Sequence, residues 1–338
     1  ELATEHYLKL PKAGDAKSVA AQYSAGEILV MELNRLTEGI EVFEALLERF
    51  PEQTDTHTHL GYYYGIVGRQ YDANRHRWEA VRLGNVRRDE LILLAAGGNG
   101  VDDSAKLGQL YKKNPDDPNL RLGFAILAAD AGDYSESEDL LRDVLKEEPM
   151  LWTAQATLGR VLIEQQQSED FQEWRNSLPD GFEESPEVWM VLGEWAEGAE
   201  RLETAARCYW EAVRIDPDDL EANLGAVRVL NSLGEEMQSV AFQTRADLLS
   251  TLAKLIEDDP TLEQQDTMEE ASRVSEQLGR LWEAWGWTHL VARADRGNPS
   301  IDDRLRKFQK VLVPSVIQET KDRSNPARQV DLSHFSAP

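Results

Sequence analysis

A recurring interval of 34 residues is the feature that most constrains how this chain folds. Pro115 and Pro149 lie 34 residues apart, and Pro217 follows after twice that interval. Gly159 and Gly193 are also 34 residues apart. A shared period in two unrelated residue types indicates an internal repeat, in which each unit buries its apolar face against its neighbours. Such an array can extend through a chain of 338 residues without one large core.

The clearest unit covers residues 186–219 and reads PEVWMVLGEWAEGAERLETAARCYWEAVRIDPDD. Its spacing predicts two antiparallel helices. Gly193 and Ala205 are small where the two helices approach closely, while Trp189 and Tyr209 fill the space between units. The unit closely resembles the consensus of the tetratricopeptide repeat (TPR) family, whose fold is a right-handed superhelix of helical hairpins. The resemblance therefore implies an all-α solenoid.

Other parts of the chain repeat this pattern with varying clarity. Units 54–87 and 118–151 are good matches, and 20–53 keeps its second helix clearly. Units 84–117 and 152–185 are degenerate, because glycines or a short second helix interrupt them. The pattern is specific for the fold and nearly silent on function.

We expect the following organisation along the chain. Residues 1–19 form a lead-in, and residues 20–299 form the repeat array, with its register left open in 220–299. Residues 300–323 form a terminal helix that is bent or broken at a proline. Residues 324–338 lose helical periodicity and form an extended tail or linker that buries little surface. A further module following this tail is one possibility that the pattern leaves open.

Composition limits the classes of partner and compartment. The net charge of −26 argues against nucleic acid, whose binding requires Lys and Arg opposite phosphates, and against an anionic membrane surface. No apolar run of about 20 residues predicts a membrane span. Cys208 is the only cysteine, so the chain forms no intrachain disulfide. The chain opens at Glu1 without a methionine, which indicates a trimmed or processed piece, and the compartment stays unknown.

Motifs for metal or nucleophilic chemistry are missing from the sequence. His57 and His59 point about 200° apart on a helix, so they cannot chelate one metal ion from one face. Cys208 has no His or Asn partner nearby in the sequence, which favours an inert buried thiol. The glycines at 97–100 match no phosphate-binding loop and are typical of a flexible connector. We predict no catalytic residue, no metal and no cofactor.

Two further groups of residues have competing interpretations. The doublets of aspartates, such as Asp102-Asp103 and Asp218-Asp219, fall between helices, where capping explains them better than acid–base catalysis. The aromatic helix with Trp282, Trp285 and Trp287 is most simply core, with an open aromatic platform for a ligand as the alternative.

The resemblance to TPR proteins places the candidate binding residues. In that family the first helices of successive units line a concave groove. Carried over unit by unit, this gives Thr58, Tyr62, Leu122, Ile126, Arg160, Met190, Glu194 and Arg228. A mixture of apolar, aromatic and charged side chains is typical of a surface that binds a peptide.

A basic stretch interrupts the acidic background. Most clusters of this kind are solvated faces. The functional alternative is docking of an acidic peptide or of the chain's own acidic repeats. Its residues are Arg69, Arg75, Arg77, Arg82, Arg87 and Arg88.

These observations predict a scaffold that binds a protein or peptide in the groove, as one module of a longer bacterial protein in the fullest form of the hypothesis. Two alternatives stay open. The array can present a partner to an enzyme or sensor domain outside this sequence, or the repeat can bind a small molecule.

Overall fold

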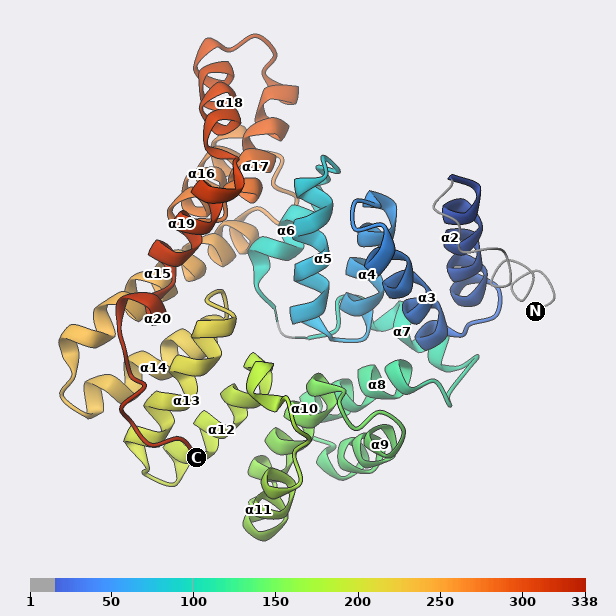
Figure 1. Cartoon of the computed structure of the whole chain (residues 1–338), viewed down its shortest axis with the longest axis vertical. Helices are drawn as coiled ribbons and strands as arrows, with labels where there is room; N and C mark the ends of the chain where they lie inside the picture. Colours follow the sequence, from blue (N-terminus) through green and yellow to red (C-terminus); the bar gives the residue numbers. More distant parts are fainter. Residues whose placement is uncertain (1–15, 99) are drawn as a thin grey trace. The chain divides into compact units, whose positions relative to one another are not determined.

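The structure is a computed structural model that describes residues 16–98 and 100–338 (Figure 1). Within these residues the chain is helical and has no β-strand, so the all-α prediction is confirmed. Most of the expected lead-in, residues 1–15, lies outside the described residues. The helices are α2 (Ala16–Met31), α3 (Leu36–Arg49), α4 (Thr54–Ile66), α5 (Gln70–Arg82), α6 (Arg88–Ala96), α7 (Ser104–Tyr111), α8 (Pro118–Asp130), α9 (Tyr134–Glu147), α10 (Trp152–Glu164), α11 (Ser168–Asn176), the short 3₁₀ turn η1 (Phe182–Glu184), α12 (Pro186–Gly198), α13 (Leu202–Ile215), α14 (Leu220–Ser232), α15 (Glu236–Asp258), α16 (Gln265–Gln277), α17 (Leu281–Ala294), α18 (Pro299–Val311), α19 (Pro314–Ser324) and α20 (Pro326–Gln329).

The chain divides into two compact units. The first unit comprises residues 1–85 and 99–176, and the second comprises 86–98 and 177–338. Helix α6 therefore packs with the second unit, against α15 and α17. The sequence did not reveal this division, because the 34-residue period runs on through residue 176.

Consecutive helices within each unit pack in pairs. The first unit contains the pairs α2–α3, α4–α5, α8–α9 and α10–α11, and the second contains α12–α13, α14–α15 and α16–α17. The three clearest sequence repeats, 54–87, 118–151 and 186–219, coincide with α4–α5, α8–α9 and α12–α13. The predicted TPR-type architecture of helical hairpins is confirmed by these pairs.

Each hairpin turns at one residue with a positive φ angle. Left-handed backbone suits glycine and is strained for most other residues, yet some turns here use Asn, Gln or Glu. From Gly132 to Gly234 these turn residues recur every 34 positions, so the repeat register continues through units whose sequence signal is weak. The seven turn residues are Asn34, Gly68, Gly132, Gln166, Glu200, Gly234 and Gly279.

Aspartates begin several helices, as the sequence predicted. The Asp117 carboxylate accepts hydrogen bonds from the backbone N–H groups of Asn119 and Leu120 at the start of α8. Asp219 accepts from Ala222 N in α14. These carboxylates satisfy N–H groups that have no partner inside the helix, and they lie at the positive end of its dipole.

The C-terminal part of the second unit differs from the sequence expectation. Helix α18 ends at Val311 and α19 begins at Pro314, so the terminal helix is broken at the proline. Residues 324–338 were expected to bury little surface, and this expectation is not met. Leu332 is fully buried, and α20 packs against α13 and α15.

Candidate functional site

The predicted groove residues of the first unit divide into buried and accessible ones. Tyr62 on α4 is 39% exposed, and Arg160 on α10 is exposed. Thr58 is half-buried, and its hydroxyl accepts a hydrogen bond from Asn85 Nδ2 at 2.8 Å. Leu122 and Ile126 on α8 are buried, so they cannot contact a partner in this conformation. Their side chains pack the core because α8 is enclosed more completely than a groove-lining helix would be.

The predicted groove residues of the second unit divide in the same way. Met190 on α12 is buried, and Glu194 is half-buried. Arg228 on α14 is exposed and pairs with Glu197 across 3.1 Å. The accessible members of the predicted set are therefore mainly Tyr62, Arg160 and Arg228.

Tyr62 lies in acidic surroundings. Burial, together with the negative charges of Asp103 and Asp102, raises the pKa of its phenol. Its ring lies 5.6 Å from the buried ring of Tyr63. An exposed aromatic side chain next to two carboxylates is suited to an apolar group with a neighbouring positive charge.

The basic stretch does not form an open basic patch, because every one of its arginines faces a carboxylate of this chain. The sequence alternative of docking an acidic peptide there is therefore corrected: the carboxylates come from the chain's own helices and loops. The pairs are Arg69 with Asp72, Arg75 with Glu44, Arg77 with Asp102, Arg82 with Glu79, Arg87 with Asp89 and Arg88 with Glu263.

Arg77 and Asp102 form a buried ion pair in the first unit. Arg77 is 1% exposed, and its guanidinium donates to the Asp102 carboxylate and to Gln70 Oε1. Gln70 Nε2 in turn donates to Asp102 Oδ1 at 2.8 Å. A buried pair of this kind depends on such additional hydrogen bonds to offset its desolvation. The group is therefore a structural element and not an accessible anion site.

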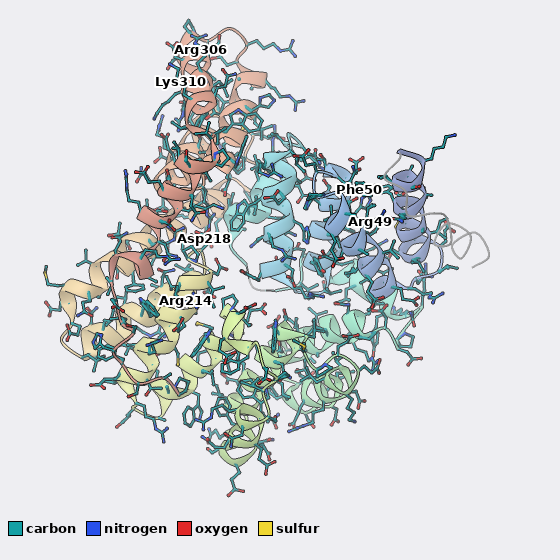
Figure 2. The ribbon with its side chains drawn as sticks, in the orientation of Figure 1. Arg49, Phe50, Arg214, Asp218, Arg306 and Lys310 are labelled. Carbon is teal, nitrogen blue, oxygen red and sulfur yellow. The ribbon has the colours of Figure 1, made fainter. Side chains whose placement is uncertain are left out.

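A second buried network ties together the second unit. The Asp218 carboxylate, in the loop after α13, pairs with Arg245 of α15 and with Arg280, which precedes α17 (Figure 2 labels Asp218). Burial opposes ionisation of Asp218, but the two guanidinium groups outweigh it and lower the pKa of this carboxyl. Arg280 also faces the fully buried Glu283. These charges are fully engaged with one another.

The histidines of the first unit form a hydrogen-bonded chain that the sequence did not predict. His57 on α4 and His76 on α5 are both buried, and their Nδ1 atoms lie 2.9 Å apart. His57 Nε2 lies 3.0 Å from Pro51 O, which can only accept, so His57 accepts at Nδ1. His76 Nε2 lies 3.1 Å from Glu44 Oε1, which also accepts from the Tyr64 hydroxyl at 2.8 Å. The chain orients Glu44 between α3, α4 and α5.

Glu44→Gln is expected to lower the stability of the first unit at neutral pH by about 1–2 kcal/mol, allowing for its partly exposed carboxylate. Burial opposes ionisation of Glu44, but His76, Tyr64 and Arg75 outweigh it and lower its pKa to about 2. Because the folded pKa is below the unfolded value, this stability is present above the unfolded pKa and is lost as pH falls toward 2.

Urea unfolding at pH 7 and at pH 2.5 checks this expectation. The difference between the native chain and Glu44→Gln should shrink at pH 2.5, and Glu48→Gln, exposed on the same helix, should change little at either pH. A difference that is the same at both pH values would contradict the assignment.

Other candidate features of the sequence lie in the core or on an open surface. Cys208 is fully buried, and burial raises the pKa of its thiol to about 12, which disfavours the reactive thiolate. Trp287 is also fully buried, while Trp282 and Trp285 are half-buried and meet edge to face. The aromatic helix α17 is thus largely packing, as the simpler interpretation predicted.

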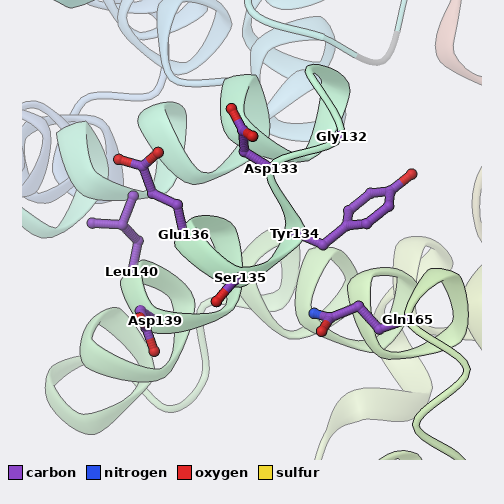
Figure 3. Close-up of a pocket in the computed structure, with 8 residues that line it drawn as sticks. All are labelled: Gly132, Asp133, Tyr134, Ser135, Glu136, Asp139, Leu140 and Gln165. Atoms are coloured by element: carbon purple, nitrogen blue, oxygen red, sulfur yellow. The ribbon is translucent and has the colours of Figure 1, made fainter.

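An open hollow lies where α9 begins, near the end of α10 (Figure 3). Asp133, Glu136 and Asp139 make it acidic, and Gln165 borders it. Within residues 16–98 and 100–338, no group of three or more His, Cys, Asp and Glu side chains is placed to hold a metal ion. The same described helices include none that is both long and apolar enough to cross a membrane.

Comparisons with known proteins agree on the kind of fold. No protein-family model and no curated protein matches the sequence. Similar solved structures include TTC0263, a thermophilic TPR protein of Thermus thermophilus, at 19% identity over 57% of this chain and 99% of that one, with a TM-score of 0.34. The Cut9–Hcn1 hetero-tetramer of the APC/C gives 12% identity, 98% and 67% coverage and a TM-score of 0.42.

Yeast Tom70 is a third similar structure, at 14% identity over 94% of this chain and 66% of that one, with a TM-score of 0.35. This chain therefore spans about two thirds of the length of the Cut9–Hcn1 chain and of Tom70. The chain resembles TPR proteins in its fold, and its architecture is established by its own helical hairpins.

Proposed function

We propose that this chain is an interaction scaffold that binds a protein or peptide through the first helices of its hairpins, with Tyr62 as an anchor. The observation that carries the proposal is the exposed Tyr62 ring on α4, the first helix of a hairpin. Stacked hairpins offer an extended surface that one compact domain lacks. Tyrosine is also among the side chains that most often supply binding energy at interfaces.

The charge of the partner follows from the surroundings of Tyr62. Asp102 and Asp103 lie near its ring, and the whole chain carries a net charge of −26. The neighbouring arginines of α5 are already paired with carboxylates. A partner segment with an apolar or aromatic residue beside Lys or Arg therefore fits this surface best, and opposite charge would also speed association.

Site-specific photocrosslinking tests this proposal. A benzophenone amino acid is placed at Tyr62 in the full chain and, as a control, at Met150, which is 58% exposed in the same unit. The Tyr62 position should capture a protein from an extract of the source cells that the Met150 position does not capture. The crosslinked segment is then made as a labelled peptide, and its affinity is measured by fluorescence anisotropy.

Tyr62→Ala is expected to weaken binding of that peptide about tenfold, or by ~1.4 kcal/mol, because it removes a central aromatic anchor. Met150→Ala should leave the affinity unchanged. Equal capture at both positions, or equal affinities for both variants, would show that the first-helix face is not the binding surface.

A further inference from the structure

The C-terminal segment of this chain lies against the second helices of two neighbouring hairpins. Figure 1 shows residues 325–338, in dark red, running past α15 and along α13. Helix α20 contacts both α13 and α15 within the second unit. Pro326 and Ala327 are buried, and Leu332 is fully buried. This segment is thus bound to the surface of the helical array, although it belongs to none of its hairpins.

Side chains of the array hold the segment by its main chain. Trp210 Nε1 on α13 donates to Val330 O at 2.7 Å, and the Arg207 guanidinium donates to Ser333 O. Arg245 Nη1 on α15 donates to Ser324 O at 2.7 Å. Hydrogen bonds to carbonyl groups do not depend on which side chains the bound segment carries. Leu332 supplies the fully buried side chain between the Val330 and Ser333 carbonyls.

The donors on α13 are positioned by the helix itself. Glu211, which is buried, accepts from Arg207 Nη2 and from Arg214 Nε, each at 2.6 Å, one turn apart on either side. The Arg207 guanidinium also lies 5.2 Å from the centre of the Trp210 ring. Because these contacts do not involve the C-terminal segment, the binding surface is organised before the segment docks, which lowers the cost of binding.

We propose that this face of α13 and α15 is a second peptide-docking surface, which the chain's own residues 324–333 occupy and which a partner peptide of the same chemistry can take over. That chemistry is an extended segment with an aliphatic residue two positions after the carbonyl that Trp210 binds. The surface lies on the second helices of the hairpins, so it is separate from the Tyr62 face and does not depend on the function proposed for it.

The attached segment has a concentration advantage over any free peptide. A short tether gives an effective concentration in the millimolar range, so a free peptide of similar affinity competes poorly with it. Weakening the attached segment should therefore reveal the surface. Leu332→Asp achieves this, because an aspartate carboxylate cannot be buried at that position without a large desolvation cost.

The test uses the full chain and a fluorescein-labelled peptide of residues 324–338 with the native sequence. The Leu332→Asp chain is expected to bind this peptide at least tenfold more tightly than the native chain does. Ser336→Asp, exposed beyond the docked residues, should behave like the native chain. Adding Trp210→Phe to Leu332→Asp should weaken the peptide, because the donor to the residue-330 carbonyl is lost. A folded Leu332→Asp chain that gains no affinity overturns the proposal.

Hydrogen exchange of the native chain provides a test that needs no variant. Amides of residues 326–335 should exchange through local opening, faster than those of α13, because a displaceable segment opens without unfolding the array. Exchange of the segment only at the rate of global unfolding would show that it is an integral part of the unit. That result would overturn the proposal, as would a Leu332→Asp chain that fails to fold.

Discussion

Gly193→Leu is expected to destabilise the second unit by about 3 kcal/mol, at the upper end of what overpacking usually costs. A Cβ atom at Gly193 would lie 2.8 Å from Tyr209 Cε1, closer than such atoms approach each other. The Tyr209 ring cannot move aside, because Gly225 faces the same ring and a Cβ there would lie 2.7 Å from it. The Tyr209 hydroxyl is also fixed by a 2.6 Å hydrogen bond to Glu197.

Gly198→Leu is the matched control for this substitution. Gly198 is on the same helix, α12, but a Cβ atom there would meet nothing within 4 Å. It should therefore leave stability unchanged or raise it slightly, since glycine is unfavourable in a helix. Chemical and thermal unfolding of both variants measures the difference. Similar losses in the two variants would mean that the cost comes from the backbone of α12 and not from the contact with Tyr209.

This packing is the part of the fold that the sequence predicted best. The 34-residue spacing located the hairpins, and the small residues Gly193 and Ala205 marked where α12 and α13 cross. The positive φ angles at Gln166 and Glu200 could not be predicted in the same way, because these side chains do not advertise left-handed backbone. Only their distance from Gly132 and Gly234 gives their positions away.

The candidate site was harder to predict, because a place on a first helix does not determine exposure. Ile126 and Met190 occupy the expected positions, yet neighbouring side chains bury them. Tyr62 occupies the equivalent position on α4 and stays exposed. Burial depends on which helices pack against each face, and this is a property of the whole array that repeat spacing alone does not contain.

The aspartate doublets show a similar limit. In Asp102-Asp103 and Asp218-Asp219, the second residue caps a helix, as capping rules predict. The first residue instead forms a buried ion pair, Asp102 with Arg77 and Asp218 with Arg245. The arginine partners are 25 and 27 residues away in the chain, so local sequence could not reveal them.

Arg77 occupies the same repeat position as Tyr209, and the surrounding residues explain the exchange. Tyr209 donates its hydroxyl to Glu197, whereas the position equivalent to Glu197 in the repeat of Arg77 is Gly65. A Cβ atom on Gly65 would lie 2.0 Å from Asp102 Oδ2. The missing side chain therefore leaves space for the Asp102 carboxylate, which replaces Glu197 as the partner of the residue in this position.

Arg77→Met is accordingly expected to cost about 3–5 kcal/mol of stability in the first unit, the usual cost of breaking a buried ion pair. The substitution leaves the Asp102 carboxylate, whose side chain is 17% exposed, without its cationic partner. Arg82→Met is the matched control. Arg82 lies on the same helix and pairs with Glu79, but its side chain is 36% exposed, so its loss should cost less than about 1 kcal/mol.

A double-mutant cycle separates the ion pair from the packing of the Arg77 side chain. Asp102→Asn removes the negative charge and keeps an oxygen that can accept from Gln70 Nε2. If the charge on Asp102 causes the loss, Arg77→Met should cost at least about 1 kcal/mol less in the Asp102→Asn background than in the native one, since contacting residues couple by about 0.5–3 kcal/mol. Urea unfolding of the four chains gives this coupling energy. Additive costs would instead mean that Arg77 stabilises α5 by filling the space beside Gly61, where a Cβ atom would lie 3.1 Å from its Cγ.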